Sequence, residues 1–461
     1  MSSDELPIAA IATAVGPAAL AVIRVSGSGC VRLLSSRFSR PDALRSAAGH
    51  TLHHGAVHDG ENRVVDEVLV AVYRAPASYT GEESAEVFCH GSPAGVRRVF
   101  GALLSAGFAA AAPGEFTRRA FINGKLDLTR AEAVNEIVGA QTTDAHALAM
   151  DRLSGSVERA IEEIRAQLVG IMAQIAIQLD YPEEETGPVD ADRMGLKEAG
   201  DRCRSIASTC ERGRLYQHGA RVAIAGRTNA GKSSLFNRLL RQDRSIVSET
   251  HGTTRDYVEA LIDVCGVPVR LFDTAGLRES SEAIEQEGMR RSSTVVASAD
   301  LVLYVVDAYE GPTREDAERL EQIPRHTPTL RVLNKVDLGG DPSRHRSAAS
   351  ELSAIPVSAL TGAGIDHLND AILSTLLDEK AGSGGGPTPA TVIIDSERQR
   401  DLLLRAADAA DRAVESLSAS LPADVVAVDL QEALEAVGEI TGEISSAEIL
   451  DEMFRGFCVG K

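Results

Sequence analysis

The sequence is poor in cysteine and contains no C-x-x-C pair. Its six cysteines are scattered along the chain: Cys30, Cys89, Cys203, Cys210, Cys265 and Cys458. Zinc sites and disulfide frameworks both draw on closely or regularly spaced cysteines, so this pattern indicates neither. It fits a protein of the reducing cytoplasm, where free thiols persist.

A long apolar run is also missing. No apolar stretch approaches the ~20 residues that a membrane-spanning helix needs, so we expect no membrane partner. Residues 8–25 are rich in apolar side chains, but the acidic start Met1-Ser-Ser-Asp-Glu5 is unlike a secretory signal. We predict instead that residues 19–25 form a core strand.

Positive charge is scarce as well. The chain carries 67 acidic and 47 basic residues, a formal net charge of −20. Such a balance disfavours non-specific binding of nucleic acid, which depends on a basic surface. An RNA partner must therefore meet a local basic patch or a basic partner protein.

The strongest motif that is present is Gly226-Arg-Thr-Asn-Ala-Gly231-Lys232-Ser233. It fits G-x-x-x-x-G-K-[ST] and lies between an apolar run and an amphipathic pattern, which predicts a strand, a phosphate-binding loop and a helix. Lys232 can reach the β- and γ-phosphates, and the Ser233 hydroxyl can bind Mg²⁺. The predicted phosphate-binding residues are Asn229, Ala230, Gly231, Lys232, Ser233 and Ser234.

A second motif lies downstream, where a nucleotide-hydrolysing domain needs it. An apolar strand ends at Asp273, and the residues Asp273, Thr274, Ala275 and Gly276 form D-x-x-G. Asp273 can hold Mg²⁺ through water, and the Gly276 N–H can sense the γ-phosphate. Alone the motif is weak, but after a phosphate-binding loop at this distance it is strong.

A third motif indicates that the base is guanine. It reads Asn334, Lys335, Val336 and Asp337. An ionised carboxylate only accepts hydrogen bonds, and guanine offers it two adjacent donors that adenine lacks. Asn334 can bond the base edge and the phosphate-binding loop, and the Lys335 stem can cover the base. The loop of Ser358, Ala359 and Leu360 is similar to the one that offers a backbone N–H to the guanine oxygen.

The segment between the phosphate-binding loop and Asp273 is expected to contain a further residue that senses the γ-phosphate. Thr254 is our choice for the residue that completes Mg²⁺ coordination, as threonines of switch loops do. Together the motifs resemble the translation-factor-like class of small GTPases. Many of those relatives have, directly after D-x-x-G, a Gln that orients the attacking water, whereas this chain has Leu277. That polar group, and the charge of an arginine finger, must come from elsewhere.

The length of the chain allows about three domains. We assign the GTP-binding domain to residues 216–380 and an N-terminal α+β domain to residues 1–122. A Gly/Ser/Pro-rich stretch at 381–390 predicts a flexible linker.

The pattern is helical on both sides of the GTP-binding domain. Apolar residues recur at spacings of three and four from Leu153 to Ile175, and residues 396–418 and 424–441 are helical by pattern. We predict one helical domain, split into residues 123–215 and 381–461 by the inserted domain. The predicted fold is thus a multidomain α/β protein.

Motifs beyond the GTP-binding domain carry a full-length resemblance. They begin with Ile23-Arg24-Val-Ser-Gly and Ser78-Tyr-Thr-Gly-Glu82-Glu83-Ser-Ala-Glu86. They continue with residues 113–128, and the most specific is the C-terminal Phe457-Cys458-Val459-Gly460-Lys461. With these residues the chain resembles the family of the tRNA modification GTPase MnmE, also called TrmE.

The resemblance implies a function in the chemical modification of tRNA. Such proteins form homodimers through an N-terminal domain that binds 5-formyl-tetrahydrofolate. With the flavoprotein MnmG, in a heterotetramer, they add a carboxymethylaminomethyl-type group to carbon 5 of the wobble uridine, U34. The family's folate-site residues correspond to Arg24, Glu86, Lys125 and Lys461, and its functionally sensitive cysteine to Cys458. A buried ion pair or a surface charge remains the alternative for the first four residues, and a small packed hydrophobe for Cys458. We also expect Cys458 to lie on a flexible C-terminal tail, which would let it approach the folate site beside Lys461.

The resemblance also implies a K⁺-dependent pairing of the GTP-binding domains, with K⁺ in place of an arginine finger. Asn229 matches the K⁺ ligand, with backbone carbonyls of Ser248 and Thr250, and Glu285 matches the catalytic residue that acts on the attacking water. The loop residues that we assign to ligand binding are Ser248, Glu249, Thr250, His251, Gly252, Thr253 and Thr254. The proposed metal ligands are Ser233, Thr254, Asp273, Asn229, Ser248, Thr250 and Thr253.

Two other functions share the GTP-binding motifs. One is an Era-like ribosome-assembly GTPase, which would lack the N-terminal domain and the terminal F-C-V-G-K. The other is a structural GTPase that dimerises on membranes, which would need a basic amphipathic helix. The C-terminal helical segments here are acidic.

Overall fold

The computed structural model describes residues 6–180, 192–242, 258–273, 296–338, 349–350, 352–381, 392–444 and 447–460. Its contacts divide the chain into two compact units. The first consists of Met1–Asn135, Arg152–Glu162 and Glu435–Lys461, and the second of Glu136–Asp151 and Glu163–Leu434. Each unit is described by itself.

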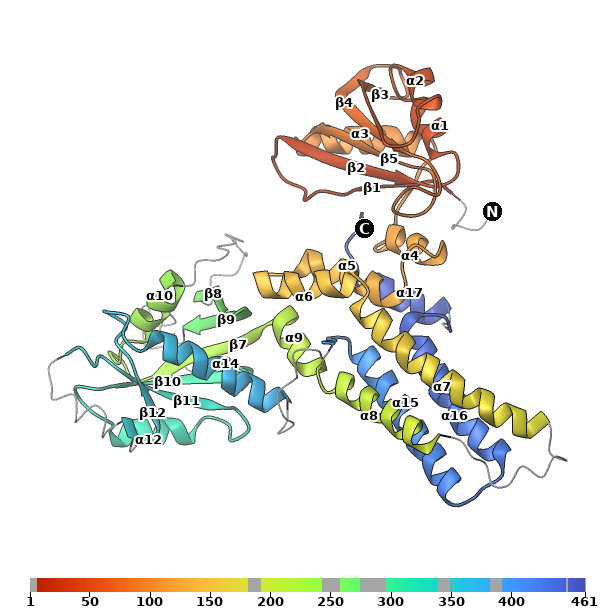
Figure 1. Ribbon diagram of the computed structural model, residues 1–461. Coiled ribbons are helices and arrows are strands. Elements are labelled where there is room, and N and C mark those ends of the chain that lie inside the picture. The colour runs from red at the N-terminus through yellow and green to blue at the C-terminus, as the bar shows by residue number, and fades with distance from the viewer. Residues whose placement is uncertain are drawn as a thin grey trace. The chain divides into compact units, whose positions relative to one another are not determined.

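The first unit is built on a six-stranded sheet of order β3-β4-β5-β2-β1-β6 (Figure 1). All pairs are antiparallel except β1 with β6. The strands are β1 Ile8–Ile11, β2 Leu20–Ser26, β3 Thr51–His58, β4 Val64–Tyr73, β5 Ser84–His90 and β6 Ala109–Ala110. The helices are α1 Cys30–Ser35, α2 Pro41–Arg45, α3 Pro93–Ala106, α4 Glu115–Ile122 and α17 Ala447–Arg455.

The two faces of this sheet differ in what covers them. Successive residues of a strand point to opposite faces. One face, with Ile23, Val70 and Val87, packs into a core that also contains residues of α1 and α3. On the other face Leu20, Leu52 and, to a lesser extent, Leu69 are exposed.

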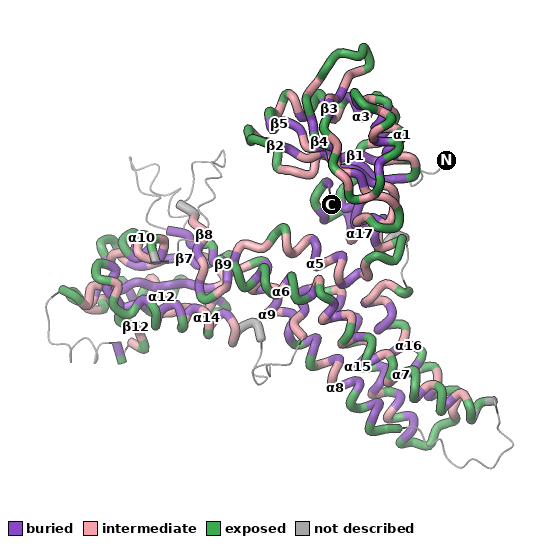
Figure 2. Tube along the Cα trace, turned by 45° about the horizontal axis from the view of Figure 1, so that its top comes forward, coloured by how far each residue is buried: buried purple, intermediate pink, exposed green. Residues whose placement is uncertain are grey.

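Helices precede and follow the GTP-binding domain in the sequence. They are α5 Leu128–Gly139, α6 Thr143–Leu153, α7 Ser156–Asp180, α8 Arg193–Ala207, α9 Cys210–His218, α15 Glu397–Ser418 and α16 Ala423–Thr441. The predicted stripe from Leu153 to Ile175 is divided between two helices: Leu153 ends α6 and is half-buried, whereas the residues from Val157 to Ile175 lie in α7 and are buried. Figure 2 shows buried and exposed residues alternating along the helices.

Contacts between these helices confirm the split helical domain. Arg193 of α8 donates to the carbonyl oxygen of Leu417 in α15 over 2.9 Å. Gln167 of α7 donates to the carbonyl oxygen of Gly195 in α8, also over 2.9 Å. The expected helices at 396–418 and 424–441 are α15 and α16, and the expected strand at 19–25 is β2.

The second sheet has the order β12-β11-β10-β7-β9-β8, parallel except for β8, as in Ras-like GTP-binding domains. Its strands are β7 Ala220–Gly226, β8 Val258–Val264, β9 Val267–Asp273, β10 Leu301–Asp307, β11 Thr329–Asn334 and β12 Ala354–Pro356. The helices are α10 Lys232–Gln242, α12 Arg314–Glu321 and α14 Ile365–Ala381, and α14 ends where the predicted linker begins. The rest of that linker lies outside the described residues.

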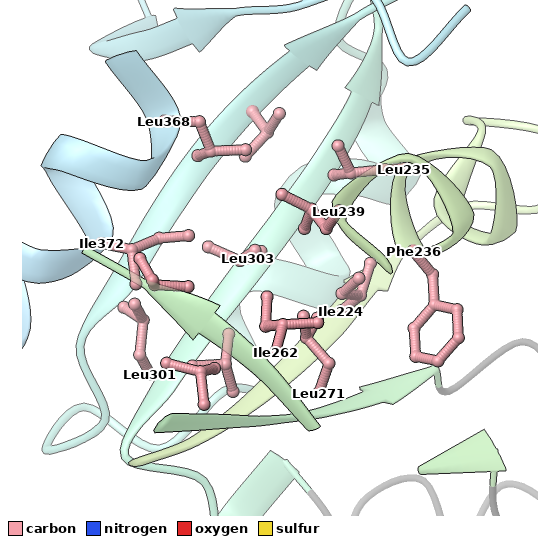
Figure 3. Close-up of a cluster of buried hydrophobic side chains, with 14 of the residues drawn as sticks. Ile224, Leu235, Phe236, Leu239, Ile262, Leu271, Leu301, Leu303, Leu368 and Ile372 are labelled. Atoms are coloured by element: carbon pink, nitrogen blue, oxygen red, sulfur yellow. The ribbon is translucent and has the colours of Figure 1, made fainter. Parts of the chain in front are cut away.

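The core of this domain fixes the strands that carry the motifs. On one side of the sheet α10 and α14 bury Leu235, Leu239, Leu368 and Ile372 against the strands (Figure 3). All seven residues of β10 are buried, as expected for a central parallel strand covered on both faces. In α/β sheets, ligands bind at the carboxyl ends of the strands. Within the described part of the chain, no helix is long and apolar enough to cross a membrane.

Candidate functional site

The phosphate-binding loop connects β7 to α10, and two glycines set its path. Gly226 has a φ of +138°, and a Cβ there would lie 2.3 Å from the carbonyl oxygen of Val305 in β10. Gly231 has a φ of +93°, and a Cβ there would lie 2.2 Å from Asn334 Nδ2. Any side chain at either position would push the loop off the neighbouring strands, so both positions require glycine.

Lys232 and Ser233 begin the helix after this loop. The buried Lys232 Nζ donates to the carbonyl oxygen of Arg227 over 2.6 Å. Ser233 Oγ donates to Asp273 Oδ2 over 2.8 Å. A hydroxyl and a carboxylate at this distance are oxygen ligands of the kind that Mg²⁺ takes. The structure thus brings together the two Mg²⁺ ligands that were predicted from separate motifs.

Asn334, at the end of β11, ties two loops together and is almost fully buried. Its Nδ2 donates to the carbonyl oxygen of Ala230 in the phosphate-binding loop, and its Oδ1 accepts from the backbone N–H of Ala359. Both contacts are 3.0 Å long. Because one amide serves both loops, the phosphate and base ends of the site are held in one arrangement.

The other residues that were predicted to read the base, Asp337 and Ser358, lie beside it. The buried Ser358 donates through its hydroxyl to Asp337 Oδ1, and the backbone N–H of Thr361 donates to Ser358 Oγ. Leu360 is exposed. The Asp337 carboxylate is therefore positioned by a neighbouring loop that was itself predicted to contact guanine.

Asn229 and Ser234 are both exposed on the phosphate side of this region. Asn229 has a φ of +65°, a left-handed conformation that asparagine tolerates better than most residues. Its carboxamide is therefore on the surface, where a ligand from solution can reach it.

Twelve predicted site residues lie outside the described residues. They are Ser248, Glu249, Thr250, His251, Gly252, Thr253, Thr254, Thr274, Ala275, Gly276, Glu285 and Lys461. Two described strands adjoin most of them in the sequence: β8 begins at Val258, shortly after Thr254, and β9 ends at Asp273, directly before Thr274.

One residue of the site was not selected from the sequence. Asp307, at the end of β10, accepts a hydrogen bond from Lys335 Nζ over 2.7 Å. Asp307 ends an apolar strand, as Asp273 does, but Asp307 belongs to no recognised sequence motif.

The N-terminal unit holds the second candidate site. Arg24 on β2 and Glu86 on β5 are register partners, and Arg24 Nε and Nη2 donate to Glu86 Oε1 over 3.0 and 2.8 Å. The guanidinium also lies over the rings of Tyr79 and Phe116, with centroids at 5.7 and 5.9 Å. Cation–π contacts of this kind hold an arginine in place.

The C-terminal segment docks onto this arginine. Arg24 Nη1 donates to the carbonyl oxygen of Gly460 over 3.2 Å, and the Gly114 N–H donates to that of Cys458 over 3.3 Å. Phe457 is buried with Leu128 and other apolar residues. The expectation of a flexible tail around Cys458 is corrected, because these contacts hold residues 457–460 in place. The residue Cys458 itself is exposed.

Lys125 is not joined to Arg24 in this structure. Its Nζ donates to the carbonyl oxygen of Pro76 over 3.2 Å. A nearby cavity of about 750 Å³ was also missed in the sequence, because its lining comes from separate segments. It is lined by Ser28, Gly29, Val31, Arg32, Arg45, Arg74, Ala75, Glu82 and Glu83.

Comparison with known proteins covers almost the whole chain. A family model described as "MnmE helical domain" matches residues 128–458, and one described as "GTP-binding protein TrmE N-terminus" matches residues 7–125. The tRNA modification GTPase MnmE of Treponema denticola is 42% identical, across 99% of this chain and 98% of the relative. That of Carboxydothermus hydrogenoformans is 37% identical, across 99% of this chain and all of the relative.

Similar solved structures cover only part of the chain. Aquifex aeolicus Era bound to GDP·AlF4⁻ is 27% identical over 43% of this chain and 66% of that chain, with a TM-score of 0.29. The G domain of the T. maritima FeoB iron transporter is 25% identical over 34% of this chain and 98% of that chain, with a TM-score of 0.26. The Era-like alternative is therefore rejected on the full-length relatives, and the chain belongs to the family of the tRNA modification GTPase MnmE.

Proposed function

We propose that this protein hydrolyses GTP with Mg²⁺ and K⁺ and uses that cycle, with the flavoprotein MnmG, to modify carbon 5 of the wobble uridine of certain tRNAs in the cytoplasm. The observation that carries the proposal is the convergence of the phosphate-binding loop, Asp273 and the Asn334 loop at the carboxyl edge of one sheet. The full-length relationship to MnmE proteins supports the tRNA-modifying role.

The proposed roles at the phosphate end follow from the side chains. Lys232 neutralises charge on the β- and γ-phosphates once it leaves the Arg227 carbonyl oxygen. Ser233 and Asp273 hold Mg²⁺, directly and through water. Bound Mg²⁺ supplies a positive charge that stabilises the transferring phosphoryl group.

At the base end, Asp337 accepts from the two donors of guanine, and Ser358 keeps that carboxylate in place. Asn334 links base recognition to the phosphate loop through Ala230 and Ala359. A site built on buried polar pairs discriminates strongly against a base that leaves them unpaired.

Two features support the proposed K⁺ requirement. Leu277 stands where a Gln would orient water, so the chain needs another source of polarity and charge. Asn229 is exposed at the phosphate-binding loop and offers a carboxamide oxygen. We assign activation of the attacking water to Glu285 and completion of the metal sites to Ser248, Thr250, Thr253 and Thr254, all outside the described residues.

We further propose that 5-formyl-tetrahydrofolate binds at Arg24, Glu86, Lys125 and the terminal Lys461. The residues fit such a ligand because Arg24 combines a charged group with two aromatic neighbours. Glu82 extends the region, because it accepts a hydrogen bond from Ser26 Oγ over 2.8 Å. Ser26 lies two residues after Arg24 on β2, and Glu82 also lines the cavity. Cys458 contributes its thiol beside this region.

The proposed homodimer has a candidate contact surface. Leu20, Leu52 and Leu69 expose apolar side chains on the sheet face that also carries Arg24 and Glu86. Burial of such a face against a second copy of the chain would remove it from water and partly enclose the folate residues.

The decisive experiment is deletion of the gene followed by mass spectrometry of tRNA nucleosides. Loss of 5-aminomethyl-type wobble uridines, restored by the wild-type gene but not by a Lys232→Ala variant, is the expected result. An unchanged nucleoside profile in the deletion strain would refute the proposed function.

A further inference from the structure

Two buried carboxylates near the nucleotide site have no part in the phosphate and base contacts proposed above. Asp307 ends β10, and Asp316 lies in the first turn of α12. Burying a carboxylate is costly unless a cation or several N–H groups replace the lost water. The partners of these two residues therefore indicate what each of them holds in place.

Asp307 holds Lys335. The parallel register of β10 and β11 puts Asp307 beside Asn334, and Lys335 follows with a φ of +69°. Few residues other than glycine, asparagine and aspartate adopt this left-handed conformation. With that backbone, Lys335 Nζ meets Asp307 Oδ2 at 2.7 Å. The lysine is thus fixed at both its backbone and its ammonium group.

The second oxygen of Asp307 closes a turn. Oδ1 accepts from the backbone N–H groups of Tyr309 and Glu310, over 2.8 and 3.4 Å. Burial alone would raise the pKa of Asp307, but the Lys335 and Tyr309 hydrogen bonds outweigh it, so its pKa is lowered. The carboxylate therefore stays charged at neutral pH and pairs with Lys335 as an ion.

The turn that Asp307 closes also contacts the phosphate-binding loop. Glu310 accepts from Arg227 Nη2 over 3.1 Å, and Arg227 Nε lies 3.0 Å from Asp316 Oδ2. The carbonyl oxygen of the same Arg227 accepts from Lys232. Segment 307–316 thus contacts the loop that holds the phosphates and the loop that reads the base.

We propose that Asp307 is a positioning residue for GTP, which it serves by anchoring Lys335 so that the apolar stem of this lysine lies across the guanine. Glu310 and Asp316 brace the phosphate-binding loop from the same segment through Arg227. The inference rests on GTP as the nucleotide of the proposed function. It assigns to Asp307 a part in binding and none in the chemical step.

A double-mutant cycle on the full-length protein tests this. Asp307→Asn, Lys335→Met and the double variant are titrated with a fluorescent N-methylanthraniloyl derivative of GDP. Asp307→Asn alone should weaken binding by about 10-fold or more, because it removes a charge-assisted contact. In the Lys335→Met background the same change should alter affinity by less than about 2-fold, because the partner is already gone.

Asp300→Asn is the matched control. Asp300 directly precedes the same strand, at its other end, and accepts from the Arg221 N–H over 2.8 Å. This variant should leave the affinity for GDP within about 2-fold of the wild type, whatever it does to stability. In steady state Asp307→Asn should raise the KM for GTP and leave kcat within about 2-fold. Its preference for GTP over ITP should also persist, because Asp337 reads the 2-amino group.

Three results would overturn the proposal. The first is that Asp307→Asn weakens GDP binding equally in the wild-type and Lys335→Met backgrounds. The second is that Asp307→Asn does not weaken GDP binding in the wild-type background. The third is that Asp307→Asn abolishes the preference for GTP over ITP. Lys335→Met should by itself weaken GDP binding to a similar extent, so the test survives poor folding of the aspartate variant. A wild-type chain that binds no guanine nucleotide would refute the nucleotide assignment, which is a separate failure.

Discussion

The hydroxyl of Thr142 donates to the carbonyl oxygen of Gly266 over 2.7 Å and accepts from the backbone N–H of Ala145. Thr142 directly precedes α6, and Gly266 lies in the turn between β8 and β9. Gly266 has a φ of +87°, and a Cβ there would lie 2.1 Å from Asp144 Oδ2. The strand that ends at the proposed Mg²⁺ ligand Asp273 is therefore joined, at its other end, to the start of a helix.

Thr142→Val should loosen this junction. Valine keeps the size of the side chain but leaves the Gly266 carbonyl oxygen and the Ala145 N–H without their partner, at a cost of about 1–3 kcal/mol. Hydrogen exchange at the first turn of α6 should become roughly 10-fold faster or more. Thr142→Ser keeps the hydroxyl and should exchange at the wild-type rate. Equal exchange in all three proteins would show that the hydroxyl does not hold the junction.

Asp337→Asn should change the preferred nucleotide. The amide presents a donor where guanine also presents one, and xanthine offers an acceptor at that position, so binding should shift from GTP toward XTP. A discrimination built on buried polar pairs can reach ~10⁴-fold. Titration of the variant with both nucleotides measures the shift. Unchanged preference for GTP would remove Asp337 from the base site.

Hydrolysis should depend on K⁺ and on paired GTP-binding domains. A positive charge at the arginine-finger position is worth about 10³–10⁵ in rate in related enzymes. This chain has Leu277 where many relatives have a water-orienting Gln, and its sequence shows no evident arginine finger. Turnover in KCl and NaCl should differ strongly, and Asn229→Ala should abolish the difference. Asn237→Ala, on an exposed position of α10, is the control and should keep it. Equal turnover in the two salts would contradict the K⁺ assignment.

The parts of the site that could be predicted are those in which the chemistry lies within a few consecutive residues. The phosphate-binding loop and the Asn334 motif each combine backbone geometry and side-chain type in one short segment. Their approach to one another, through the Asn334 amide and the Ala230 carbonyl oxygen, follows from parallel strands whose carboxyl ends share an edge. The helices were predictable because one apolar stripe repeats at helical spacing along α7 as far as Ile175.

Contacts that depend on strand register or on distant segments were not predictable in the same way. Asp307 pairs with Lys335 only because β10 and β11 align Asp307 with Asn334, and no local pattern reports that alignment. Arg24 and Gly460 are 436 residues apart, and their hydrogen bond requires the C-terminal segment to pack beside β2. A flexible tail was expected for this segment. The buried Phe457 and the Gly114 N–H hold it instead.

The docked position of Cys458 leads to the last prediction. Cys458→Ser should strongly reduce wobble-uridine modification and leave K⁺-stimulated GTP hydrolysis near normal. Serine has nearly the size of cysteine but lacks its polarisable, potentially nucleophilic sulfur. The segment is held through the backbone carbonyl oxygens of Cys458 and Gly460, and a change of side chain leaves both in place. The substitution therefore removes the thiol without releasing the segment.

Both activities can be measured on one purified protein, with the flavoprotein added for the modification assay. Val459→Ala is the matched control, because Val459 is the exposed neighbour of Cys458 and should keep both activities. Parallel loss of hydrolysis and modification in Cys458→Ser would point to a packing role for the cysteine. Full modification by Cys458→Ser would show that the exposed thiol is dispensable and has no part in the chemistry proposed beside Arg24.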